Sequence, residues 1–131
     1  MAKPRSEQLR VVGLAQKSGL APLTQGELDS LVAAQNKTYP KTSPDGIRMD
    51  RSVAGPMMLT YYKTVVGRSA DEFEVNPANF AAYRPSFIKD ACSNAGVRNL
   101  LNSGIAVRNL TRDMHGVLIY ELTVRSADCA R

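Results

Sequence analysis

Two cysteines, Cys92 and Cys129, carry the clearest chemistry in this sequence. Their spacing matches no metal-binding motif, because the chain has no Cys-x-x-Cys pair and its only histidine is His115. Cys92 falls near the end of a helical segment and Cys129 just beyond the last strand, so a helix packed across the sheet would bring them together. A bond between them would close a loop of about 38 residues and contribute about 4 kcal/mol to stability. The alternative is two buried, reduced thiols; we predict a structural disulfide, because a cysteine so near the C-terminus rarely serves packing alone.

The other residues that could support catalysis have simpler structural explanations. His115 falls at the tip of a predicted hairpin, whereas a catalytic triad needs its imidazole held between a nucleophile and an orienting group. Residues 86–89 match the S-x-x-K pattern of penicillin-recognising enzymes, but the S-D-N and K-T-G motifs that accompany it are absent. We therefore expect no catalytic residue, no cofactor and no metal ligand. The sequence leaves enzymatic activity open but favours a protein that is not an enzyme.

Helical segments flank the strands in what the sequence predicts to be a single domain over residues 1–131. Residues 6–36 have the caps and spacing of two short helices that form a hairpin. Residues 77–103 have the spacing of a long helix with one buried face. Pro85 interrupts that pattern, so we expect it to kink the helix or to split it in two.

Two β-hairpins complete the predicted fold. Residues 47–66 include a run rich in Thr, Tyr and Val, and residues 105–125 contain two clear strands around a short turn. Apolar and polar residues alternate in the last strand, which indicates one buried face and one face toward solvent. The expected fold class is α+β, with a four-stranded antiparallel sheet of two hairpins, helices packed mainly on one face, and one disulfide.

Composition restricts the class of partner and the compartment. The 131 residues include 17 Lys and Arg against 12 Asp and Glu, a net charge of +5. These cations are spread thinly and no four stand in succession, so the composition argues against nucleic acid as the partner. No run of apolar residues is long enough to span a membrane. The first residues, Met-Ala-Lys-Pro-Arg-Ser, lack a signal peptide's apolar region. A disulfide requires an oxidising compartment, so we expect a periplasmic or secreted protein whose signal peptide has been removed.

The second half of the chain, roughly residues 47–129, resembles a known family. The resemblance rests on the strand Leu59-Thr60-Tyr61-Tyr62, the helix end Ala91-Cys92-Ser93-Asn94, the run Arg98-Asn99-Leu100-Leu101-Asn102-Ser103-Gly104, a hairpin with Arg112-Asp113 and Gly116 at its turn, and the ending Val124-Arg125-Ser126-Ala127-Asp128-Cys129. The pattern is similar to small secreted Proteobacterial proteins that include the quorum-sensing-regulated virulence factor family. The resemblance implies a secreted α+β sandwich with a disulfide from helix to last strand. It implies no catalytic residue, because the family's biochemical activity is not established.

These observations favour an exported, non-enzymatic protein that binds an unknown protein partner in the envelope or outside the cell. The expected binding surface is the sheet face or edge that the helices leave uncovered. Tyr61, Tyr62 and Tyr120 are the candidate aromatic anchors, although each could equally be a half-buried strand residue.

Two other functions remain open at this stage. A small hydrolase or ligand-binding enzyme would need polar groups that converge in a pocket between helix and sheet. A basic nucleic-acid-binding domain would show steeply salt-dependent retention on DNA.

Overall fold

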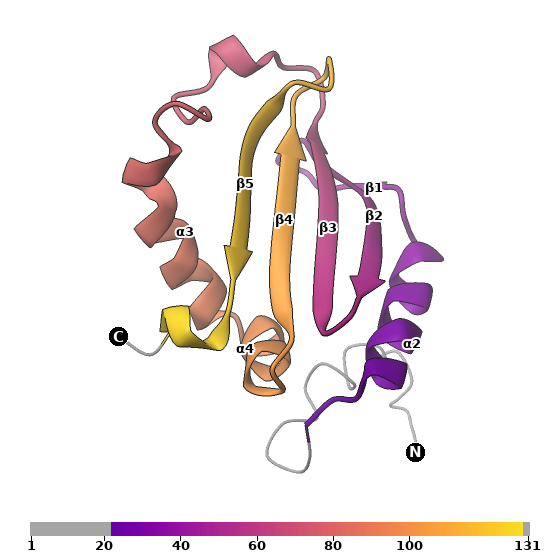
Figure 1. Ribbon diagram of the computed structural model, residues 1–131. Helices are drawn as coiled ribbons and strands as arrows, with labels where there is room; N and C mark the ends of the chain where they lie inside the picture. Colours follow the sequence, from indigo (N-terminus) through magenta and orange to yellow (C-terminus); the bar gives the residue numbers. More distant parts are fainter. Residues whose placement is uncertain (1–21, 130–131) are drawn as a thin grey trace.

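The computed structural model describes residues 22–129, in which helices pack against one side of a single mixed β-sheet (Figure 1). The first part of the helical hairpin predicted at residues 6–36 lies outside the described residues. In chain order the elements are α2 (Gln25–Asn36), β1 (Lys41–Thr42), β2 (Ile47–Gly55), β3 (Met58–Val65), η1 (Ala70–Glu72), α3 (Phe80–Ser93), α4 (Ala95–Asn102), β4 (Ala106–Arg112), β5 (Leu118–Val124) and η2 (Ser126–Cys129).

The sheet differs in two ways from the predicted four antiparallel strands. Its five strands lie in the order β1-β2-β3-β4-β5, and β3 and β4 run parallel, whereas the other neighbours are antiparallel. The parallel pair arises because α3 carries the chain back along the sheet, so β4 begins at the same end as β3 (Figure 1). The extra strand, β1, arises because a turn over residues 43–46 reverses the chain. The two residues before that turn can then pair with the start of β2.

The predicted kinked helix is two helices, and the break lies at Asn94 rather than at Pro85. Helix α3 runs through Pro85, although a proline there has no N–H to donate to the preceding turn. The backbone of Asn94 is extended, and its side chain accepts a hydrogen bond of 3.0 Å from the backbone N–H of Val97. Asn94 therefore caps the start of α4, and this capping geometry ends one helix and begins the next.

The hydrophobic core lies between one side of the sheet and helices α2 and α4. Leu59 of β3 and Leu28 of α2 are fully buried, and Leu101 of α4 is 1% exposed. Helix α2 is fixed at its start by a capping box, in which the side chains of Thr24 and Glu27 bond each other's backbone N–H. Helix α3 has no fully buried residue, and it meets the core through half-buried side chains such as Phe80, Phe87 and Ile88.

The loop between β4 and β5 is organised by the buried carboxylate of Asp113, which is 2% exposed. Its Oδ1 accepts hydrogen bonds of 2.8 Å from the N–H groups of His115 and Val117, and its Oδ2 accepts one of 2.6 Å from Ala70. Burial alone would raise the pKa of Asp113, but these backbone donors outweigh it and hold the pKa below the ordinary value of 3.8. Asp113 thus ties the segment that begins η1 to the tip of the second hairpin.

Replacing Asp113 with Asn should lower the thermal midpoint at neutral pH and reduce its sensitivity to acid. A carboxylate whose pKa is lowered by folding stabilises the protein above its ordinary pKa, and that contribution is lost as the pH falls below it. An amide retains one acceptor oxygen but presents an NH2 group where the other oxygen stood. The measurement is Tm from pH ~7 to ~3 for both proteins. The difference in Tm between the two proteins should become smaller toward low pH. A difference that stays constant with pH would contradict the stabilising role of the Asp113 carboxylate.

Candidate partner-binding surface

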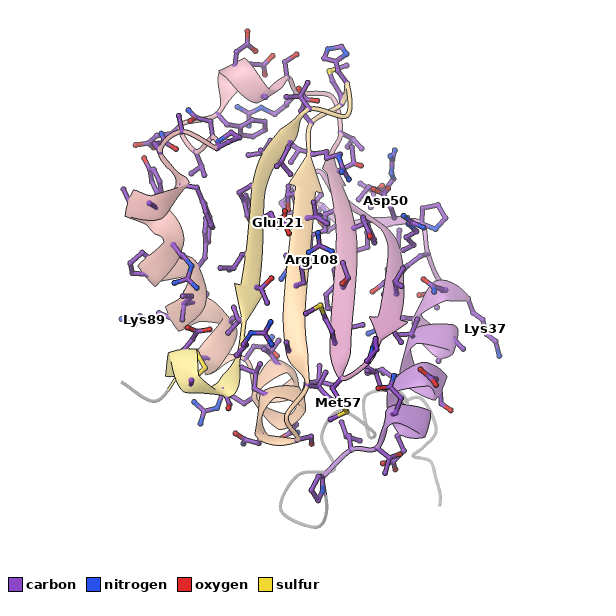
Figure 2. All side chains as sticks on the ribbon, in the orientation of Figure 1. Lys37, Asp50, Met57, Lys89, Arg108 and Glu121 are labelled. Atoms are coloured by element: carbon purple, nitrogen blue, oxygen red, sulfur yellow. A yellow bond between two sulfur atoms is a disulfide. The ribbon has the colours of Figure 1, made fainter. Side chains whose placement is uncertain are left out.

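One face of the sheet carries long charged side chains and lies opposite the helices of residues 22–129. The strand residues that pack in the core with those helices all point to one side: Ala54, Leu59, Tyr61, Val107, Tyr120, Leu122 and Val124. We call the opposite side the outer face, and Figure 2 shows Arg108 of β4 and Glu121 of β5 on it. Its exposed or half-buried residues are Arg48, Asp50, Arg51, Val53, Met58, Tyr62, Thr64, Arg108, Arg112, Leu118, Glu121 and Thr123. Four residues of this face are almost fully buried: Thr60, Ala106, Leu110 and Ile119.

A β-bulge places two consecutive charged residues on the outer face. The pairing of β2 with β3 shifts between Met49 and Arg51, so Asp50 is the extra residue of β2. Without the shift, strict alternation would turn Arg51 toward the helices and Ser52 outward. With it, Arg51 stands opposite Tyr62 on the outer face, and Ser52 is buried on the helix side at 2% exposure.

The arginines of the outer face outnumber its carboxylates, four to two. Both carboxylates are engaged: Asp50 pairs with Arg48 at 2.5 Å, and Glu121 pairs with Arg108 at 2.7 Å. The guanidinium of Arg51 lies 4.2 Å from the centre of the Tyr62 ring, a cation–π contact. Within residues 22–129 no carboxylate forms an ion pair with Arg51 or with Arg112 of β4. The outer face therefore has a surplus of two positive charges.

The three predicted aromatic anchors do not lie together. Tyr62 is on the outer face, but its neighbour Tyr61 points to the helix side, because successive residues of a strand face opposite ways. Burial raises the pKa of Tyr61 to about 12, and its hydroxyl accepts a hydrogen bond from Gln35. Tyr120 also points inward, where its ring stacks 5.1 Å from Phe80. The structure therefore does not bring the three tyrosines together on one uncovered face: Tyr61 and Tyr120 are half-buried strand residues on the helix side, the alternative that the sequence left open, and Tyr62 stays the anchor candidate on the outer face.

The edge of the sheet beside α2 is closed by side-chain amides. Asn36 donates to the carbonyl oxygen of Ser52 and accepts from its N–H, both at 2.9 Å, as a neighbouring strand would. Gln25 does the same at the hairpin end, donating to the carbonyl of Gly55 at 2.9 Å and accepting from the N–H of Met57 at 2.7 Å. Because these groups are satisfied, this edge offers little to a partner strand, and the outer face is the better candidate.

A second concave feature lies at the disulfide, which joins Cys92 to Cys129 as the sequence predicted. A surface pocket of about 590 Å³ opens there between α3, the start of α4 and η2. Among its lining residues Asp128 is the one carboxylate and none is histidine, so it lacks the paired groups that acid–base catalysis uses. The spacing of Arg84, Ile88 and Cys92, four residues apart, was a signal in the sequence that these side chains share one side of α3.

The remaining candidates for chemistry, His115, Ser86 and Lys89, do not form one site, and of the three Lys89 alone lines the pocket at the disulfide. His115 is exposed at the hairpin tip, and Ser86 and Lys89 are exposed on α3. Within residues 22–129 no group of three or more His, Cys, Asp or Glu side chains is placed to hold a metal ion. In the same part of the chain, none of the helices has the length and apolar character needed to cross a membrane.

The α+β fold with its mixed sheet is shared with proteins of known structure. A Pseudomonas aeruginosa protein classed as secreted superposes with a TM-score of 0.65 at 16% identity, covering 80% of this chain and 91% of that one. The pilotin of the Vibrio vulnificus type 2 secretion system superposes with a TM-score of 0.60 at 19% identity, covering 78% of this chain and 87% of the pilotin. The type II secretion system pilotin of Vibrio cholerae superposes with a TM-score of 0.56 at 18% identity, covering 91% of this chain and 99% of the pilotin.

These similarities establish the fold alone. The chain matches no protein-family model and no curated protein sequence, so the resemblance to the quorum-sensing-regulated virulence factor family is not confirmed.

Proposed function

We propose that this chain is an exported, envelope-associated protein that acts by binding another protein rather than by catalysis. The observation that carries the proposal is the outer face, where Arg51 lies on the ring of Tyr62 without a carboxylate partner among residues 22–129. Arginine and tyrosine are the residue types most enriched among the energetic anchors of protein interfaces. Because these two come from paired strands, the anchor is rigid before binding and loses little entropy on association.

The disulfide and the related folds support the compartment that we propose. Disulfides persist in oxidising compartments such as the periplasm. Two of the proteins with this fold are pilotins of secretion systems, and a third is classed as secreted. We therefore propose a periplasmic or secreted location and a partner in the envelope, with membership of the virulence factor family as a narrower proposal that rests on the sequence resemblance.

Site-specific photo-crosslinking tests the binding surface. A photoreactive residue at Val53, an exposed position of the outer face, should give a discrete covalent adduct with one envelope protein in the native cell. The same residue at Lys37, just beyond the end of α2, should not give it. Arg51→Glu should reduce the Val53 adduct, and Lys37→Glu, the same change of charge, should leave it unchanged. Equal adducts from both positions, or none from Val53, would remove the outer face as the binding surface.

A further inference from the structure

The pocket at the disulfide is lined by both apolar surface and cationic side chains. Apolar surface comes from Pro85, Ile88 and the two sulfur-bearing side chains of the Cys92–Cys129 bond. The remaining lining residues are Arg84, Lys89, Ser93, Arg98 and Asp128. A volume of about 590 Å³ lies within the range of pockets that hold small ligands or a few side chains of a bound chain.

Three cations face one carboxylate in this pocket, and that carboxylate is already engaged. Oδ2 of Asp128 accepts a hydrogen bond of 2.8 Å from the backbone N–H of Arg125, which holds the side chain at the pocket wall. Its Oδ1 lies 3.9 Å from Nη2 of Arg84, too far for a hydrogen bond. Lys89 and Arg98 form no ion pair with any of residues 22–129. The pocket thus presents two cations, Lys89 and Arg98, with donors available to an incoming anion.

We propose that this pocket binds an acidic segment of a protein partner, with a carboxylate on Lys89 and Arg98 and an adjacent apolar side chain against Pro85, Ile88 and the disulfide. Charge complementarity selects the carboxylate, and the surface of Pro85, Ile88 and the disulfide selects an apolar neighbour. The proposal rests on the proposed function as a protein-binding protein. It adds a second contact, because α3 packs on the helix side of the sheet and the pocket is therefore separate from the outer face.

The disulfide makes this site dependent on oxidation. Two of its lining residues, Asp128 and Cys129, belong to η2, a segment of four residues beyond the last strand. The bond from Cys129 to Cys92 holds that segment against α3. When the Cys92–Cys129 bond is absent, noncovalent contacts alone must hold η2 against α3. Asp128, which lines the pocket from η2, is then no longer fixed in position. The pocket should therefore bind its ligand well in the oxidised chain and poorly in the reduced chain.

Chemical-shift mapping of the full chain with two matched peptides tests the proposal. The probes are acetyl-Leu-Glu-Leu-Asp-amide and its counterpart with Gln and Asn in place of the acids. The acidic peptide should shift the backbone amide signals of Ile88, Ser93 and Asp128, and the neutral peptide should not. Lys89→Glu and Arg98→Glu should each weaken binding about tenfold, the value of one charge-assisted hydrogen bond. Lys37→Glu is the matched control, since Figure 2 shows Lys37 and Lys89 on opposite sides of the molecule.

Each other result would overturn the pocket proposal. Equal shifts with both peptides, no shifts with either, or a loss with Lys37→Glu as large as with Lys89→Glu would exclude a specific carboxylate site. Shifts produced only by phosphatidylglycerol vesicles would assign the pocket to anionic lipid instead. An adduct from Val53 together with no peptide binding would refute the pocket alone, whereas loss of the adduct with peptide binding intact would refute the outer face alone.

Discussion

Replacing both Cys92 and Cys129 with serine is expected to lower the free energy of unfolding by about 4 kcal/mol. The bond joins residues 37 positions apart, and without it the unfolded chain regains the entropy that the closed loop withheld. Small domains have a total stability of about 5–15 kcal/mol, so this loss is a large fraction of it. It corresponds to a fall in Tm of roughly 15 °C. Urea unfolding of the oxidised wild type and of the double variant at one pH measures the difference.

The neighbouring substitution Ser126→Ala serves as the control, because Ser126 is exposed at the start of η2 and should change stability by less than about 0.5 kcal/mol. In the double variant, hydrogen exchange should accelerate first at the amide of Asp128, which bonds the carbonyl of Arg125 at 2.9 Å. A double variant within about 1 kcal/mol of wild type would show that noncovalent contacts already hold η2 in place.

The sequence predicted those features that depend on local pattern. The alternation in β5 indicated correctly that Leu122 and Val124 face the core. The prediction that Cys92, near the end of a helix, meets Cys129 beyond the last strand is confirmed by the disulfide. The sequence did not predict the parallel pairing of β3 with β4. The relative direction of β3 and β4 depends on the end of the sheet at which the chain re-enters after α3 and α4. That position is decided by how the helices pack, not by any residue in the two strands.

The candidate surface was harder to predict than the fold, because its composition depends on one inserted residue. Nothing in the sequence around Asp50 distinguishes a bulge from a regular strand, yet the bulge decides that Arg51 rather than Asp50 stands opposite Tyr62. The position of Tyr61, by contrast, could have been inferred, since adjacent strand residues cannot both anchor a partner on one face. The cationic pocket combines residues from α3, α4 and η2, and only the tertiary structure brings these together.

Truncation of Leu59 to alanine is expected to destabilise the protein by about 3 kcal/mol. Leu59 is fully buried in β3, the middle strand of the sheet, where it pairs with Ala54 on one side and Val107 on the other. Its side chain lies in the core that α2 and α4 share, so the cavity left by the lost methyl groups cannot be filled by solvent or by movement of a surface loop. Chemical denaturation measures the loss.

Val53→Ala is the matched control, because it truncates a side chain on the outer face of the sheet instead of one in the core. Val53 lies on β2, the strand paired with β3, but it points to the outer face and is 39% exposed, so its truncation should cost less than about 1 kcal/mol. Because the outer face contributes little to the core, Leu59→Ala should reduce the folded population without changing the affinity of the folded protein for its partner. Similar losses of stability in the two variants would contradict this division, since they would require Val53 to be packed as tightly as Leu59.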